Sequence, residues 1–476
     1  MWKQLEPKAV FRWFAWVSRF PHGSGHTEQL AEACLAFARE RKLACRRDAI
    51  GNVVICKPGR GSSQSAAPLI LQAHLDMVLA AAPESGRDLL AEGPRLQTDG
   101  EWVWAEGTTL GADDGIGVAV CLALLDDPTL EHPPLEIVLT VDEETGMKGA
   151  LALDCAGLQG RHMINLDAEQ EGIIYVGCAG GNKVSCVLPV RRIFTSGRGW
   201  ELRISGLRGG HSGMDIHRGR ASAARLIGRT LFRLSRETAL YAAEAELGQA
   251  DNAIAAEGTV RFLLPEQADP TAEVQKLEAC FRSEYAAADP ELRLVLEPWR
   301  PDGPVLDRDS TNRLITLLVC GVQGVEEMSQ AVPGLPQTSG NLGLLRVTDR
   351  EIRGEFCIRS AFDSQKTMLN ERLACLAAAL GGRAAYSEGC PAWEYRAESP
   401  LRVCCEKAYE ALYEKKPISR MIHAGAECGV FAAAIPELDC ISIGPEIRGA
   451  HTPAERMRVE SVRRTWTWLL EILRRL

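Results

Sequence analysis

Two histidines and several carboxylates follow apolar stretches of this chain, and their types suit metal chemistry. They are His74 and Asp76, Asp113 and Asp114, Glu143 and Glu144, Asp167 and His451. Imidazole nitrogens and carboxylate oxygens together are the ligands that a pair of hard-to-borderline divalent cations requires. The set therefore predicts a site for two metal ions, which can clamp an attacking water and polarise a carbonyl group.

The spacing of these residues indicates separate tasks. His74 and Asp76 are two apart on an extended segment, so both point to one side and Asp76 can hold the far ring nitrogen of His74. Glu143 and Glu144 are adjacent and point in different directions. One of them can bind a cation while the other serves as a general base, and the spacing alone does not say which.

Asp113 lies in the stretch GTTLGADDGIG, where glycines allow the backbone a tight path close to an ion. An aspartate whose two oxygens contact different cations would bridge them. Each feature alone is more typical of a polar strand end, a solvated acidic turn or an acidic helix cap. Their joint occurrence at strand ends favours the metal centre.

The elements that must position these residues are buried strands. Continuous apolar runs of the kind found in strands buried on both faces occur at 68–74, 135–141, 162–166 and 440–443. Helical patterns at 115–125 and 147–153 lie between them. Strands that alternate with helices predict an α/β domain with a mostly parallel, mixed sheet between helices, and ligands bind beyond the carboxyl ends of such strands.

The middle of the chain has a different pattern. Strands are expected at 200–205, 258–264, 291–297 and 351–358, and helices at 221–235, 271–285 and 365–380. Strands and helices in this order are typical of small α+β sandwiches. We therefore expect an inserted α+β domain at 187–387 and a first domain assembled from 1–186 and 388–476.

Composition excludes several classes of protein. The chain has 476 residues, of which 46% are apolar, and a net charge of −9. There is no basic excess for nucleic-acid binding through phosphates, and no apolar stretch predicts a membrane span. The sixteen cysteines show no Cys-x-x-Cys spacing, so we expect most of them to be reduced, buried residues of a cytoplasmic protein.

Seven segments, in order, carry a resemblance to a known family. They are QAHLDMV, TTLGADDGIG, VDEETGMKGA, NLDAEQEGIIYVGCAGG, GGHSGMDIHRGRASA, HAGAECGVF and SIGPEIRGAHTPAE. The chain resembles the aminoacyl-histidine dipeptidases, which are cytosolic nonspecific dipeptidases among the dizinc metallopeptidases of the aminoacylase and carboxypeptidase type. The match covers nearly the whole chain and implies the same catalytic domain with an inserted lid.

The resemblance implies roles for the clustered residues. His74, Asp113 and Asp167 would hold one Zn²⁺, and Asp113, Glu144 and His451 would hold a second, with Co²⁺ or Mn²⁺ as substitutes. Asp76 would orient His74, and Glu143 would be the general base that moves a proton from the attacking water to the leaving amine. It also implies a cis peptide bond between Asp113 and Asp114.

Further residues would bind the dipeptide substrate. His211 would stabilise the oxyanion, often across a homodimer in relatives, and Arg359 would pair with the substrate carboxylate. Asn252 would hydrogen-bond that carboxylate, and Glu427, with His423, would line the amine end.

Two other functions stay open from the sequence. An amidohydrolase acting on N-acyl amino acids would use the same metal site with a different pocket, and a binding protein could keep the fold without turnover. The main prediction is a metal-dependent dipeptidase acting on Xaa-His or a broad range of dipeptides. The run from Thr452 to Glu455 also fits a capping box, which predicts a helix directly after His451.

Overall fold

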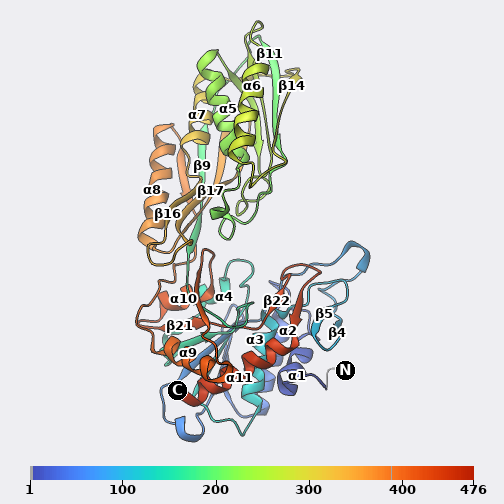
Figure 1. Ribbon diagram of the computed structural model, residues 1–476, viewed down its shortest axis with the longest axis vertical. Helices are drawn as coiled ribbons and strands as arrows, with labels where there is room; N and C mark the ends of the chain where they lie inside the picture. Colours follow the sequence, from blue (N-terminus) through green and yellow to red (C-terminus); the bar gives the residue numbers. More distant parts are fainter. Residues whose placement is uncertain (1–3, 388) are drawn as a thin grey trace. The chain divides into compact units, whose positions relative to one another are not determined.

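The structure, a computed structural model, describes residues 4–387 and 389–476 (Figure 1). It contains two compact units. The first consists of 1–178, 393–421 and 426–476, and the second of 179–392 and 422–425. The predicted domain boundaries at 186/187 and 387/388 stay a prediction. None of the described helices combines the length and the apolarity that crossing a bilayer requires.

The first unit is built on an eight-stranded sheet. In spatial order its strands are β1 (Ala44–Arg47), β2 (Val53–Lys57), β6 (Leu135–Thr140), β3 (Leu69–His74), β7 (His162–Asn165), β21 (Asp439–Ser442), β8 (Ile173–Cys178) and β20 (Ile418–Ile422). The four central strands, β6 to β21, run parallel, whereas β1, β2 and β8 pair antiparallel with their neighbours. The predicted mixed sheet with a parallel centre is confirmed.

Helices pack on this sheet and shield its apolar strands. They are α1 (Lys8–Val17), α2 (Glu28–Glu40), α3 (Ala112–Asp126), α4 (Lys148–Ala152), α9 (Pro400–Tyr413), α10 (Glu427–Ala434) and α11 (Val459–Arg475). All residues of β3 and β6 are buried, as continuous apolar runs require. Helix α3 packs on β3 and on α1, while α9 and α10 pack on β21.

Parallel pairing brings the site residues to one edge of the sheet. His74 is paired with Thr140 in the β3–β6 register, and Gln72 is paired with Asn165 in the β3–β7 register. The carboxyl ends of the three strands therefore lie side by side, and the segments that follow them carry the predicted ligands.

A small four-stranded sheet holds the segment after His451. Its strands are β22 (Ile447–Arg448), β23 (Arg456–Arg458), β5 (Trp102–Ala105) and β4 (Leu96–Thr98). The capping-box prediction is wrong here, because 452–455 form turns and the chain continues into β23. The Glu455 carboxylate accepts hydrogen bonds from the backbone of another segment, which removes the local partner that the predicted helix needed.

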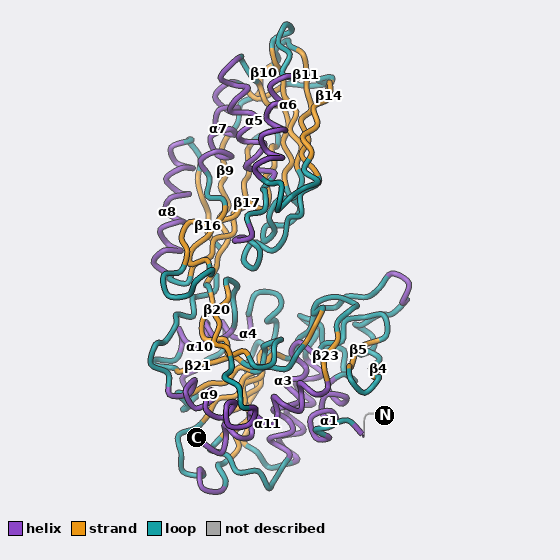
Figure 2. Tube along the Cα trace, viewed as in Figure 1, coloured by secondary structure: helices purple, strands orange, loops and turns teal. Residues whose placement is uncertain are grey.

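The second unit is a sheet with helices on one side (Figures 1 and 2). Its strands are β9 (Gly180–Pro189), β11 (Arg198–Ser205), β12 (Tyr241–Leu247), β13 (Gly258–Leu264), β14 (Arg293–Trp299), β16 (Gly324–Met328), β17 (Pro336–Val347), β18 (Glu351–Ser360) and β19 (Arg383–Tyr386), with β10 (Arg192–Ile193) and β15 (Val305–Leu306) as a separate pair. The covering helices are α5 (Ala223–Glu237), α6 (Thr271–Glu284), α7 (Arg308–Cys320) and α8 (Asp363–Ala379). The predicted α+β character of this part is confirmed.

Candidate metal centre

His74 ends β3, and its buried ring is held in one tautomer. Nδ1 lies 2.9 Å from the backbone oxygen of Asp76, which can only accept, so Nδ1 carries the proton. Nε2 therefore keeps its lone pair and faces two carboxylates, 3.2 Å from Asp113 Oδ1 and 3.4 Å from Asp167 Oδ1. This is the nitrogen that a metal ion would bind.

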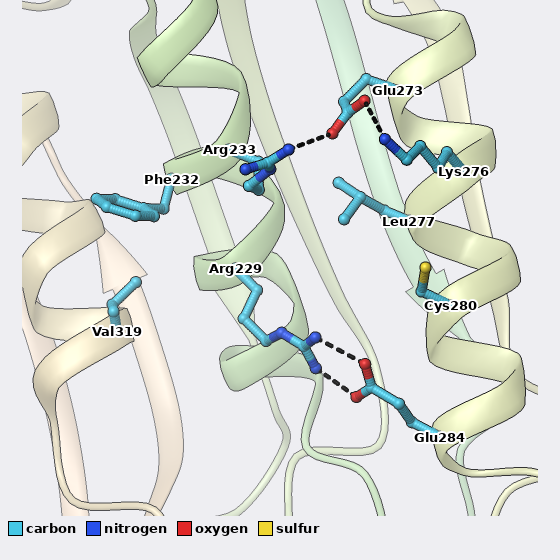
Figure 3. Close-up of a pocket in the computed structure, with 9 residues that line it drawn as sticks. All are labelled: Arg229, Phe232, Arg233, Glu273, Lys276, Leu277, Cys280, Glu284 and Val319. Atoms are coloured by element: carbon cyan, nitrogen blue, oxygen red, sulfur yellow. Dashed lines mark hydrogen bonds and ion pairs between the residues drawn. The ribbon is translucent and has the colours of Figure 1, made fainter.

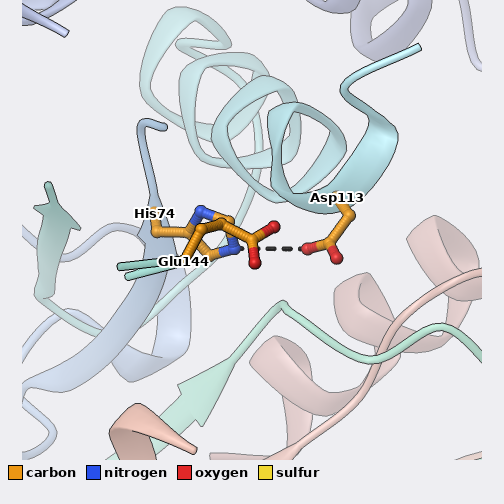
Figure 4. A group of neighbouring side chains, drawn as sticks. All are labelled: His74, Asp113 and Glu144. Carbon is orange, nitrogen blue, oxygen red and sulfur yellow. Dashed lines mark hydrogen bonds and ion pairs between the residues drawn. The ribbon is translucent and has the colours of Figure 1, made fainter. Parts of the chain in front are cut away.

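Asp113 presents its two carboxylate oxygens to two different groups of side chains. While Oδ1 faces His74, Oδ2 lies 3.1 Å from His451 Nε2, and that same nitrogen lies 2.8 Å from Glu144 Oε1. Figure 4 shows His74, Asp113 and Glu144 pointing toward one another from a strand end, a helix start and a loop. Asp113 thus stands where a bridging ligand between two ions would stand.

The donor set fits divalent cations. One ligand atom each of His74, Asp113 and Glu144 lies within 4.8 Å of the others, and imidazole with carboxylate is a set that Zn²⁺ accepts. Glu144 Oε1 is buried and makes no hydrogen bond, although the His451 ring nitrogen is close by. Two ligands of one metal ion lie close together without hydrogen-bonding to each other, because both direct their lone pairs at the ion. Glu144 Oε1 and His451 Nε2 have this arrangement.

The carboxylates also create a strongly negative field. The neighbouring carboxylates of Asp113 and Glu144 stabilise the protonated ring of His451 and raise its pKa to about 11. Burial raises the pKa of Asp167 to about 6, although the neighbouring His74 opposes this. Burial also raises the pKa of Glu143 well above its usual range, and the charges of Asp167 and Glu427 add to the rise. Bound cations would offset the repulsion among these groups.

Asp76 was predicted to orient His74, and the structure shows that its carboxylate also contacts other groups. Its Oδ1 is 3.5 Å from His74 Nδ1, whose proton goes to the backbone oxygen instead. The carboxylate accepts hydrogen bonds from the backbone N–H groups of Glu143 at 3.0 Å and Glu144 at 3.2 Å, and from Ser24 Oγ at 2.7 Å. Asp76 therefore fixes the backbone of both glutamates as well as lying beside His74.

Among the residues that the structure describes, Asp114 also groups with His74 and Asp167 and could compete as a ligand. Its oxygens are already used, since Oδ2 accepts the backbone N–H of His74 at 3.1 Å and Oδ1 accepts that of Gly117 at 3.1 Å. Burial raises its pKa well above the usual range. Asp114 ties α3 to β3, a role that the sequence did not reveal. The peptide bond between Asp113 and Asp114 is cis, as predicted.

Comparison with known proteins places this centre in a family. Residues 70–475 match the family described as Peptidase family M20/M25/M40. The chain belongs to this family. It is therefore a metallopeptidase, and the predicted family relationship is confirmed.

Two full-length relatives of this M20 peptidase are close. The cytosol non-specific dipeptidase of Escherichia coli (strain K12) is 37% identical over 477 residues, covering 99% of this chain and 98% of the relative. The crystal structure of aminoacylhistidine dipeptidase from Vibrio alginolyticus has a TM-score of 0.91 and 34% identity, covering 100% of this chain and 98% of that one. A tripeptidase structure from Staphylococcus aureus, with a TM-score of 0.59 and 15% identity over 98% of both chains, shares the fold.

Glu427 of this M20 peptidase begins α10 and is fully buried beside the metal-centre residues. Its Oε2 accepts hydrogen bonds from Gln72 Nε2 and, at 2.8 Å, from Thr140 Oγ1. Its Oε1 has no hydrogen-bond partner among the described residues. Burial raises the Glu427 pKa to about 7. A buried carboxylate with one free oxygen can receive a cationic group.

The second unit gathers a group of basic side chains. His211 Nδ1 accepts backbone N–H groups from Gly213 at 3.2 Å and Met214 at 3.1 Å, so the neutral ring carries its proton on Nε2. Arg359 Nη2 lies 3.4 Å from that Nε2. Arg359 Nε is buried without a hydrogen-bond partner, and none of the described carboxylates pairs with this guanidinium. Such a group is suited to an anionic ligand.

His423 and Asn252 also lie in this unit. His423 Nε2 is 2.7 Å from Ser339 Oγ, and burial, together with the charge of Arg359, lowers the His423 pKa to about 3. His423 thus faces Arg359, whereas the sequence associated it with Glu427. Asn252 is exposed, and its backbone oxygen accepts the N–H of Ser212. The buried amide at this turn is Asn341, which donates to the backbone of Ala253 at 2.8 Å and which the sequence analysis missed.

A groove between α5 and α6 in the second unit holds none of the predicted site residues (Figure 3). Its charged side chains are paired with one another. Arg229 makes two hydrogen bonds to Glu284, at 2.6 and 2.8 Å, and Arg233 lies 3.4 Å from Glu273. Glu273 also lies 3.9 Å from Lys276, so each charged side chain of the described lining has a partner of opposite charge.

Proposed function

We propose that this M20 peptidase is a dipeptidase that uses two divalent cations, Zn²⁺ by preference, to hydrolyse Xaa-His or a broad range of dipeptides. The observation that carries the proposal is the division of the Asp113 oxygens between His74 on one side and His451 on the other. The names of the two full-length relatives, a non-specific dipeptidase and an aminoacylhistidine dipeptidase, support the dipeptide as substrate.

The residues divide into two sets of ligands. His74, Asp113 and Asp167 would hold one ion, and Asp113, Glu144 and His451 the other. Bound there, the cations would polarise the scissile carbonyl group and lower the pKa of the attacking water.

Glu143 is the proposed general base. Asp76 holds its backbone, and burial raises the pKa of its carboxyl group, which makes the carboxylate a stronger base. In this mechanism Glu143 takes a proton from the attacking water. It then delivers that proton to the nitrogen of the departing amine.

Four residues are proposed to bind the substrate. Glu427 would receive the free amine, and Arg359 would pair with the terminal carboxylate, with Asn252 as an additional hydrogen-bond donor. His211, with its proton on Nε2, would donate to the oxyanion that forms on the carbonyl oxygen. A cytoplasmic location and a homodimer are part of the same proposal. The location is supported by the name of the relative from Escherichia coli, and the dimer by the family resemblance.

The test is a substrate panel on protein reconstituted with Zn²⁺. Xaa-His and Xaa-Gly dipeptides should be turned over, whereas N-acetyl and N-succinyl amino acids should not. Preferred turnover of the acylated compounds would assign the chain to the amidohydrolases instead. If the protein binds stoichiometric metal but turns over neither class of compound, the proposed reaction is wrong.

The matched variants are Glu143→Gln and Glu131→Gln, the second being an exposed glutamate that is not among the proposed site residues. The first should lose activity by roughly 100-fold or more while metal content stays at two ions, because only the proton transfer is removed. The second should resemble the parent enzyme. Normal turnover of a metal-loaded Glu143→Gln enzyme would remove Glu143 from this role.

A further inference from the structure

Glu455 is a buried carboxylate whose four hydrogen-bond donors all come from one short stretch of backbone. It is 2% exposed. Its Oε2 accepts the N–H groups of Leu110 at 2.7 Å and Gly111 at 3.0 Å, and its Oε1 accepts those of Ala112 at 2.8 Å and Asp113 at 3.3 Å. The last of these donors is the backbone of the residue proposed to bridge the two metal ions.

Two of these donors, the N–H groups of Ala112 and Asp113, belong to the first turn of α3 and have no acceptor within the helix, and the other two directly precede it. The residue before the helix, Gly111, has no side chain to cap them and adopts a positive φ of 69°. Glu455 replaces that missing cap from a distant part of the sequence. Its negative charge is also favoured at a helix N-terminus.

Glu455 is equally well tied to His451. The turn between them is closed by hydrogen bonds from Thr452 N to Gly449 O at 3.2 Å and from Glu455 N to Thr452 O at 3.1 Å. His451 itself sits in this turn with φ of 64°. Directly after Glu455 the chain enters β23, which pairs with β5. Neither end of the turn is therefore free to shift.

We propose that Glu455 is a positioning residue that sets the spacing between Asp113 and His451, and thereby the geometry of the metal ion these two residues share. The Glu455 side chain joins the two segments that supply the ligands of this metal ion. No other described carboxylate accepts from the 110–113 backbone. The inference deepens the proposed function and rests on it, because it concerns the same metal centre.

The decisive variant is Glu455→Gln, which keeps the size of the side chain. An amide has one oxygen, so in either orientation its NH₂ group must face a pair of backbone N–H groups. The 110–113 segment should then relax, and the second equivalent of Zn²⁺ should bind about 10 to 100 times more weakly, the usual cost of losing a group that orients a ligand. Affinity is measured by chelator competition on folded, metal-free protein.

Hydrogen exchange gives a readout that does not depend on activity. In metal-free Glu455→Gln, the peptide containing 110–113 should exchange faster than in the parent protein. Glu455→Asp, whose shorter side chain cannot reach both pairs of donors, should fall between the two and serves if the Gln variant does not fold.

Glu136→Gln is the matched control. Glu136 is also buried, and it accepts backbone N–H groups from Gln159 at 3.0 Å and Gly160 at 2.9 Å, near the opposite end of β6 from the metal centre. This variant should lose stability but keep the parental affinity for both Zn²⁺ ions. A general effect of losing a buried carboxylate would weaken metal binding in both variants alike.

Parental Zn²⁺ affinity and parental exchange at 110–113 in folded Glu455→Gln or Glu455→Asp would overturn the inference. So would equal losses of affinity in the Glu455 and Glu136 variants. Failure of the proposed function has a different signature, because the parent protein would then bind two ions without hydrolysing dipeptides, while the Glu455 variants would still differ from it in metal affinity.

Discussion

Replacing Asp76 tests whether its carboxylate holds the backbone of Glu143 and Glu144 in place. The carboxylate is 1% exposed and accepts from Ser24 and from the N–H groups of Glu143 and Glu144. Asp76→Ala would leave two partly buried N–H groups without an acceptor. At about 1–3 kcal/mol for each unsatisfied group, the free energy of unfolding should fall by about 2–6 kcal/mol. That is a large part of the stability of a typical domain.

Asp76→Asn gives a graded version of the same change. Glu143 N–H is bound by Oδ1 and Glu144 N–H by Oδ2, so an amide satisfies one of them and loses the other. We expect a loss of about 1–3 kcal/mol in unfolding free energy. Because Glu144 is a proposed ligand and Glu143 the proposed base, kcat or Zn²⁺ affinity should also fall about 10- to 100-fold.

The assay combines urea denaturation of the metal-free protein with kcat, KM and zinc content of the loaded enzyme. Ser24→Ala is the control, because it removes one hydrogen bond to Asp76 and leaves both backbone contacts intact. It should cost about 1 kcal/mol and leave kcat near the parental value. A stable Asp76→Asn enzyme with parental kcat and parental zinc affinity would refute the reasoning.

Three further predictions concern the substrate and the second unit. Arg359→Ala should reduce kcat/KM for free dipeptides roughly 10- to 100-fold, because a charge-assisted hydrogen bond to the substrate carboxylate is lost. The kcat/KM for C-terminally amidated dipeptides should stay unchanged. An equal loss for both kinds of substrate would contradict carboxylate pairing. Glu427→Gln should raise KM for dipeptides with a free amine and spare N-acetylated ones, a comparison made under identical metal loading. His423 stays neutral when folded because burial lowers its pKa to about 3, whereas the unfolded chain takes up a proton below about 6.5. The unfolded state binds more protons, so stability should fall from pH 6.5 toward pH 3, by about 2 kcal/mol at pH 5, and urea midpoints of His423→Gln should lack this slope.

The central strands were predictable because their sequence carries the physical signal directly. Residues 68–74, 135–141 and 162–166 are continuous apolar runs that end in polar residues, and the structure places β3, β6 and β7 there. A strand buried on both faces needs an apolar side chain at nearly every position. The polar residues that end these runs are therefore left at the edge of the sheet, where the candidate ligands meet.

The second unit was less predictable. Strand β17 carries three buried polar residues, Thr338, Ser339 and Asn341, so it lacks the apolar alternation that marks a strand. Their partners lie on other elements, such as His423 for Ser339 and the backbone of Ala253 for Asn341. Hydrogen bonds of this kind satisfy polar groups inside a core, and no local pattern records them.

The wrong prediction of a capping box at Thr452 and Glu455 has the same origin, which is hydrogen bonding between distant segments. Ligands such as His74 and Asp113 are recognisable because a residue type and a neighbouring strand or glycine suffice to describe them. Glu455 has the spacing of a local cap, yet its carboxylate accepts from the four backbone N–H groups of 110–113, at and just before the start of α3, and not from its own turn. A carboxylate accepts from whichever unpaired donors the fold brings within reach. The residues that position the metal ligands are therefore determined by contacts between distant segments. Spacing along the chain identifies the ligands far better than it identifies these positioning residues.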